Sequence, residues 1–163
     1  MERLWSPWRM EYLEAAHDEE PEACVFCALL EGDDPQGARV LAREQLAFVT
    51  LAKYPYNPGH LLILPARHTG ELEDLTPPEH AAIAVLMQRS IRALRETADP
   101  HGFNVGLNLG RIAGAGIPGH LHWHVVPRWG GDTNFMPVIG ETRVLPELLA
   151  ETYRKLAPRF ADP

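Results

Sequence analysis

Two alternating stretches joined by a glycine-rich segment constrain the fold of this chain more than any other feature. Apolar residues occupy every second position from Phe103 to Leu109, and they do so again from Leu121 to Val125. A period of two is typical of a β-strand with chemically different faces. The segment 110–119 between them contains four glycines. The sequence therefore predicts an antiparallel hairpin.

Further elements are predicted on both sides of this hairpin. Thr76, followed by prolines and Glu79, has the pattern of a capping box, and apolar residues recur at helical spacing as far as about Thr97. The other expected elements are a short helix from Ser6-Pro7, two short strands within 40–51, a turn at 55–59, a strand at 60–65, a long loop at 128–142 and a last helix at about 146–156. This order predicts an α+β domain built on an antiparallel sheet.

The length and charge limit the classes of protein to consider. A chain of 163 residues with 45% hydrophobic residues suits one folded domain, which we divide into an N-terminal arm (1–20), a catalytic core (21–128) and a C-terminal loop and helix (129–163). The net charge of −7 argues against a nucleic-acid partner. No apolar run reaches the roughly 20 residues of a membrane span, and the first residues do not form a signal peptide. We expect a cytoplasmic protein without membrane or nucleic-acid partners.

His120, His122 and His124 are the strongest chemical signal in the chain. On one strand their side chains would share a face at intervals of about 6.6 Å. A merely polar face would more often carry Thr, Lys or Glu. Histidines at this spacing can share a catalytic metal, or one of them can act as a nucleophile toward phosphorus. The nearby glycines, with Asn104 and Asn108 on the preceding strand, favour the second interpretation because backbone amides beside glycine can approach a phosphate.

The two cysteines, Cys24 and Cys27, are spaced as half of a zinc site or as a redox pair. The acidic, turn-rich sequence around them does not provide the strand-to-helix context of a thioredoxin-like motif. Inert thiols are a third interpretation. A zinc site needs two further ligands, and the candidates are His60, His68 and His120, followed by His17, His80 and His101.

The motifs together resemble those of the histidine-triad (HIT) family of nucleotide hydrolases and transferases. The segment HLHWHVVP is similar to the family signature. The segments LWSPWRMEYL, CVFC, YPYNPGHLLILPARH, GFNVGLNLGRIAGAGIPGH and GDTNFMPV resemble the branch that acts on dinucleoside polyphosphates. The resemblance implies a HIT-like fold, with a sheet of about five antiparallel strands, one long helix and one or two shorter helices.

The resemblance also implies roles for individual residues. His122 would be the nucleophile, His124 would contact the phosphate and assist the leaving group, and His60 would lie behind the triad and help to orient the nucleophile. Asn108 and the backbone of Gly116 and Ile117 would bind phosphate. In zinc-bearing members the corresponding ligands would be Cys24, Cys27, His68 and His120, forming a closed structural site.

One position departs from the family pattern. Many members carry Asp or Asn eight residues before His60, where it binds the ribose, and this chain has Ala52 there. Phe48 and Leu51 nearby are candidates for an apolar base pocket.

The activity implied by the resemblance is cleavage of a dinucleoside polyphosphate, above all diadenosine tetraphosphate, through a nucleotidyl-histidine intermediate. Phosphate as acceptor would make the protein a phosphorylase, which we favour, and water would make it a hydrolase. The alternatives are hydrolysis of nucleoside phosphoramidates, a metalloenzyme with the triad on one metal, and a non-catalytic nucleotide-binding regulator. The resemblance further implies a homodimer joined across the helix that begins at Thr76.

Overall fold

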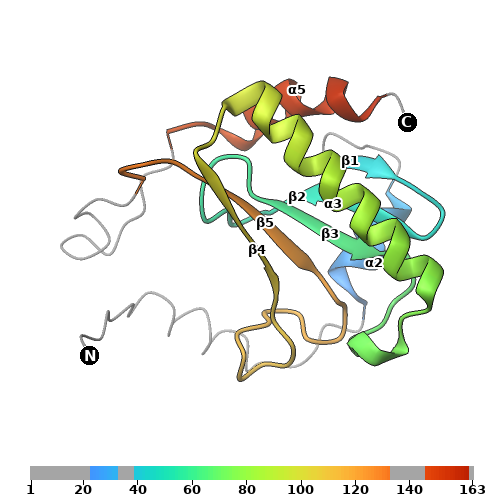
Figure 1. Cartoon of the computed structure of the whole chain (residues 1–163). Helices are drawn as coiled ribbons and strands as arrows, with labels where there is room; N and C mark the ends of the chain where they lie inside the picture. Colours follow the sequence, from blue (N-terminus) through green and yellow to red (C-terminus); the bar gives the residue numbers. More distant parts are fainter. Residues whose placement is uncertain (1–22, 33–38, 133–145, 162–163) are drawn as a thin grey trace, which may run out of the picture.

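The computed structural model describes residues 23–32, 39–132 and 146–161. They form an antiparallel sheet of five strands in the order β1-β2-β3-β5-β4, with helices packed around it (Figure 1). The strands are β1 (Val40–Arg43), β2 (Ala47–Leu51), β3 (Leu61–Pro65), β4 (Gly102–Leu107) and β5 (Trp123–Arg128). The helices are α2 (Val25–Glu31), the 3-10 helix η1 (Leu72–Asp74), α3 (Pro77–Ala98), α5 (Leu149–Leu156) and the 3-10 helix η2 (Ala157–Phe160). The α+β class and the five-stranded sheet are confirmed.

Helix α3 covers one face of the sheet (Figure 1). It starts at the predicted capping box, where Thr76 accepts from the backbone of Glu79 and the Glu79 carboxylate accepts from the backbone of Thr76. Its apolar stripe packs with the sheet into the main core, which includes Ile83, Leu94 and Val125. The opposite face of the sheet is thereby left for α2 and the site.

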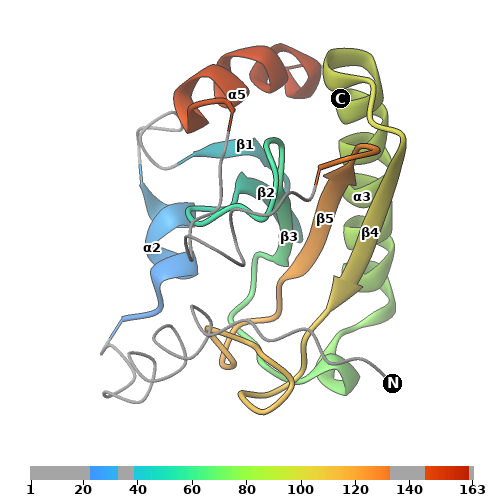
Figure 2. The ribbon, with the colours of Figure 1, turned by 90° about the vertical axis from the view of Figure 1, so that its left-hand side faces the viewer.

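A second apolar cluster lies on that opposite face. Its buried members are Phe26, Val40, Phe48, Ala52, Leu62 and Leu64. Alternation along β2 explains the division, because Phe48 belongs to this cluster whereas Val49 and Leu51 belong to the core under α3. Helix α2 borders β1, and Figure 2 shows it beside the sheet on the side away from α3.

Some expectations about the elements need correction. Helix α2 was not predicted, since the cysteine region was expected to be turns. The second strand of the hairpin begins at Trp123, so His120 and His122 precede it instead of lying on it. The last helix begins at Leu149 instead of residue 146. The expected helix at Ser6-Pro7 and most of the predicted loop at 128–142 lie outside the described residues. No helix in the part that the structure describes is long and apolar enough to cross a membrane.

Candidate active site and metal centre

His124 stands in a row of residues that crosses the sheet on the face away from α3. It pairs with Leu62 on β3 and with Gly106 on β4. Cross-strand partners present their side chains on the same face, so Leu62 flanks His124 on one side and Gly106 on the other. Leu62 is a member of the second apolar cluster. The Gly106 side opens into a cavity.

The His122 side chain is held by the backbone of another triad residue. Its Nδ1 lies 2.8 Å from the carbonyl oxygen of His120, which can only accept, so Nδ1 carries the proton. Nε2 therefore keeps its lone pair. Burial lowers the pKa of His122, which further favours the neutral ring. A neutral imidazole with a fixed lone pair is the form required of a nucleophile.

His60 and His124 form a second fixed pair. The backbone N–H of Tyr56 donates to His60 Nδ1 at 3.1 Å, so the His60 proton lies on Nε2. His60 Nε2 lies 2.9 Å from His124 Nδ1 and donates to it. The proton of His124 is therefore on Nε2, which is buried and has no hydrogen-bond partner among the described residues. The structure thus places His60 against His124, the neighbour of the predicted nucleophile.

Burial also governs the charge of His124. Desolvation, with a smaller contribution from His122, lowers the pKa of His124 to about 4. The ring is neutral at physiological pH and acts as an N–H donor. Its centroid is 5.2 Å from that of His122, so this donor and the predicted nucleophile are neighbours.

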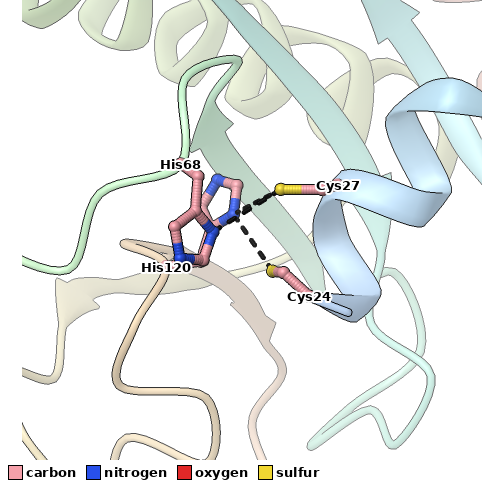
Figure 3. Close-up of side chains that lie close together, drawn as sticks. All are labelled: Cys24, Cys27, His68 and His120. Carbon is pink, nitrogen blue, oxygen red and sulfur yellow. Dashed lines mark hydrogen bonds between the residues drawn. The ribbon is translucent and has the colours of Figure 1, made fainter. Parts of the chain in front are cut away.

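The four residues predicted as metal ligands come together (Figure 3). Their nitrogen and sulfur atoms all lie within 4.8 Å of one another. Three of the separations are 3.4 Å (Cys24 Sγ to His120 Nδ1), 3.5 Å (Cys27 Sγ to His68 Nδ1) and 3.7 Å (Cys27 Sγ to His120 Nδ1). A tetrahedral ion with bonds of about 2.3 Å to sulfur and about 2.0 Å to nitrogen has nitrogen–sulfur edges of about 3.5 Å. The donor set therefore fits a four-coordinate metal ion.

The surroundings of His120 also fit a metal. Its Nε2 donates to the Pro65 carbonyl at 3.0 Å, which leaves Nδ1 unprotonated and facing the sulfurs. A metal-binding histidine commonly has its other ring nitrogen tied in this way. Of the triad, His120 alone belongs to the cluster within the described residues, so the hypothesis of one metal shared by the triad does not match the geometry.

The glycine-rich segment lies beside the triad and is partly self-bonded. Asn108 Nδ2 donates to the Gly114 carbonyl at 3.4 Å, and the Ala115 amide donates to the Gly110 carbonyl. In the described part of the chain the backbone amides of Gly116 and Ile117 have no such partner. Phosphate binding by these two amides stays a prediction, while Asn108 is seen to hold the turn.

The candidate base pocket needs one correction. Leu51 is 1% exposed in the core beneath α3, on the face of the sheet away from the triad, so it is not available to a ligand. Phe48 lies on the triad face, in contact with His120 but fully buried. Ala52 belongs to the same cluster as Phe48 and offers no hydroxyl-binding group.

Sequence reasoning missed two aromatic residues at the site. Phe26 on α2 contacts both His120 and His122, with ring centroids 5.6 Å and 5.2 Å apart. Tyr56 stacks on His60 at 4.9 Å and on His124 at 5.9 Å. The signal for each was its neighbour in the chain, since Phe26 lies between the cysteines and Tyr56 precedes the Pro-Gly-His segment.

Comparisons with known proteins agree with this geometry. The family model described as HIT domain matches residues 35–131. A protein of Mycobacterium tuberculosis named AP-4-A phosphorylase is 47% identical over 99% of this chain and 85% of its own length. The adenosine 5'-monophosphoramidase hnt1 of Schizosaccharomyces pombe is 31% identical over 65% of this chain and 74% of its own.

Solved structures give the same result. A crystal structure of a Zn-bound histidine triad family protein from Mycobacterium smegmatis superposes with a TM-score of 0.68 at 32% identity, covering 85% of this chain and 94% of that one. The triad, the fold and these matches define a histidine-triad protein. The chain belongs to the HIT family.

Proposed function

We propose that this protein is a phosphorylase of dinucleoside polyphosphates, with diadenosine tetraphosphate as substrate and inorganic phosphate as acceptor. The observation that carries the proposal is the state of His122. The His120 carbonyl holds the proton on Nδ1, and Nε2 is left as a nucleophile beside the N–H donor of His124. The relative named AP-4-A phosphorylase supports this substrate and acceptor.

The geometry suits two successive displacements at one phosphorus atom. Nε2 of His122 attacks the α-phosphorus, a P–N bond forms, and the P–O bond to the β-phosphate breaks. The electron pair of that bond leaves with ATP, and the proton on His124 Nε2 remains available as a hydrogen bond to the departing oxygen. An oxygen of inorganic phosphate then attacks the same phosphorus, the P–N bond breaks, and its electrons return to Nε2. The product of the second step is ADP.

The alternatives differ in the acceptor or in the leaving group. Water as acceptor would give AMP and a hydrolase. Cleavage of nucleoside phosphoramidates uses the same intermediate, and the relative from Schizosaccharomyces pombe favours it as the second candidate. A nucleotide-binding regulator would need none of the fixed proton positions around His122 and His124.

Analysis of the products from diadenosine tetraphosphate, with and without inorganic phosphate, tests the proposal. We expect ATP and ADP, formed only when phosphate is present. ATP and AMP in both reactions would identify a hydrolase. His122→Ala should reduce turnover by about 1,000-fold or more while nucleotide binding persists. His80→Ala, which removes an exposed histidine on α3, is the matched control. Full activity in His122→Ala would exclude the covalent mechanism.

We further propose that the ion held by Cys24, Cys27, His68 and His120 is zinc, with a structural role. Two thiolates and two imidazoles in tetrahedral arrangement are a usual zinc donor set. The relative from Mycobacterium smegmatis described as Zn-bound supports the choice. A site that needs two reduced cysteines suits the cytoplasm.

A homodimer completes the proposed assembly. Strand β4 is at the edge of the sheet, and Val105 on it is 44% exposed. Val85 on α3 is 60% exposed. An open strand edge and exposed apolar side chains are features suited to binding a second copy, and sedimentation analysis tests the stoichiometry.

A further inference from the structure

The Gly106 side of His124 opens into a cavity of about 530 Å³. It extends along β4 and β5, on the opposite side of His124 from Leu62 and the apolar cluster that contains Phe26. The residues around it are Tyr56, Asn104, Val105, Gly106, Leu107, Asn108, Ala113, His124, Val126 and Arg128. Its size lies within the range of small-molecule sites.

The part of the cavity next to His124 is open because residue 106 is glycine. Gly106 is the direct cross-strand partner of His124. A Cβ built at Gly106 would meet no atom within 4 Å. A larger residue here would fit the sheet and would occupy the space beside the catalytic ring.

The rest of the cavity supplies hydrogen-bond donors, among them the guanidinium of Arg128, whose charge is paired with Asp132. Arg128 is fixed by Asp132, which accepts from Nε at 2.5 Å and from Nη2 at 2.9 Å, and by Asn104, which accepts from Nη1 at 2.6 Å. A guanidinium has five N–H donors. Two of them have no protein partner among the described residues. Asn104 and Asn108 add two amide side chains to the same wall.

These features match one half of a dinucleoside polyphosphate. The bond that breaks lies at His122 and His124, so the two halves of the substrate extend in opposite directions from these rings. The half that is transferred then lies toward the apolar cluster that contains Phe26 and Leu62. The other half is a polyphosphate chain, which needs donors and positive charge. Along β5, the Cα atoms of His124 and Arg128 are about 13 Å apart, a distance that a chain of several phosphates can span.

We propose that the cavity bounded by Gly106, Asn104 and Arg128 is the subsite for the polyphosphate of the leaving nucleotide. This inference rests on the proposed function and adds the direction in which the substrate lies. In two in-line displacements the leaving group and the later acceptor occupy the same side of the phosphorus. Inorganic phosphate therefore enters the same cavity after ATP has left.

Gly106→Val tests the subsite, with Ala150→Val as the control. Ala150 is an exposed residue of α5 and is not part of the cavity wall. A Cβ at Gly106 meets nothing within 4 Å and valine favours strands, so Gly106→Val should not lose stability. We expect kcat/KM for diadenosine tetraphosphate to fall at least 30-fold in Gly106→Val and less than 3-fold in Ala150→Val.

Binding measurements separate this subsite from the rest of the site without relying on turnover. Inorganic triphosphate is the probe for the leaving half, and AMP is the probe for the half that is transferred. By calorimetry, Gly106→Val should weaken triphosphate at least 10-fold and change AMP less than 3-fold. Asn104→Asp should do the same, because it adds a negative charge to the cavity at nearly constant volume while retaining an oxygen that can accept from Arg128. Size-exclusion chromatography confirms that the oligomeric state is unchanged.

The outcomes distinguish the two proposals. Unchanged triphosphate binding in both variants, or equal losses of AMP and triphosphate, would overturn the subsite. A wild-type protein that forms no ATP from diadenosine tetraphosphate would overturn the proposed function, whereas the binding measurements would still decide whether the cavity takes a polyphosphate.

Discussion

His60 Nε2 donates a hydrogen bond of 2.9 Å to His124 Nδ1, and this single contact determines which nitrogen of His124 carries its proton. The two residues are 64 positions apart in the chain. Because Nδ1 of His124 accepts, its N–H is at Nε2, on the side where the substrate is proposed to bind. We propose that His60 is a positioning residue that acts through His124.

Replacing His60 should lower kcat more than it changes KM. His60→Ala removes the donor, so the proton of His124 is no longer confined to Nε2, and we expect kcat to fall about 10- to 100-fold. His60→Gln retains an amide donor and should recover part of the loss. Steady-state kinetics on folded variants check this, and an unchanged kcat in His60→Ala would contradict the role.

The His124 ring should remain neutral well below the usual range for histidine. Burial lowers its pKa to about 4, against an ordinary value of about 6.5. Its imidazole resonances should therefore not move between pH 7.5 and 5.5, and they should begin to shift only as the pH approaches 4. A ring with the ordinary pKa would be about 90% protonated at pH 5.5. A midpoint near 6.5 in an NMR titration would show that the ring is not desolvated as described.

Removal of the metal should lower the thermal stability of the fold and should not remove a catalytic group. The four ligands join α2, the segment after β3 and the segment before β5, so loss of the ion frees three parts of the chain (Figure 3). We expect one zinc ion per chain, and a midpoint of thermal unfolding about 10 °C lower after chelation or in Cys27→Ala. Metal analysis and calorimetry measure both. A chelated protein that stays fully folded but loses all activity would instead indicate a catalytic metal.

Glu79 should make the free energy of unfolding depend on pH in the acidic range. The hydrogen bond from Arg67, then those from Thr76, lower the pKa of the Glu79 carboxyl from 4.5 to about 2. Because the folded-state pKa is the lower one, the stabilisation is fully present above about pH 4.5 and is lost as the pH falls toward 2.

Glu79→Gln should therefore cost about 1–2 kcal/mol of unfolding free energy at pH 7, and the difference from wild type should shrink in acid. The control is Glu96→Gln, which breaks an exposed pair with Arg159 and should cost less than about 0.5 kcal/mol. Equal costs for the two variants in urea titrations at pH 7 would argue against a special role for Glu79.

The elements that the sequence predicted are those determined by local pattern. Helix α3 was predicted because its capping box and its apolar stripe are both visible between Thr76 and Thr97. Strands β1, β2 and β4 were predicted from alternation, β3 was predicted from its short apolar run, and the order of these elements gave the α+β class. Helix α2 was not predicted, because the buried residues that share a cluster with Phe26, among them Phe48 and Leu62, are distant in the chain.

The site was predictable in its residues but not in its arrangement. The four metal ligands were inferred by resemblance and do come together. The spacing of the triad suggested one shared face, yet the His120 ring turns to the cysteines while its carbonyl holds His122. The pairing of His60 with His124 depends on strands β3 and β5 being neighbours, which no local pattern encodes.

One backbone amide determines which ring nitrogens of His60 and His124 carry their protons. The N–H of Tyr56 fixes His60, and His60 fixes His124. Every amino acid except proline has that backbone N–H. A change of side chain at position 56 can therefore alter what stacks on the two rings without changing which ring nitrogen carries the proton. The tautomers of His60 and His124 therefore do not depend on which side chain position 56 carries.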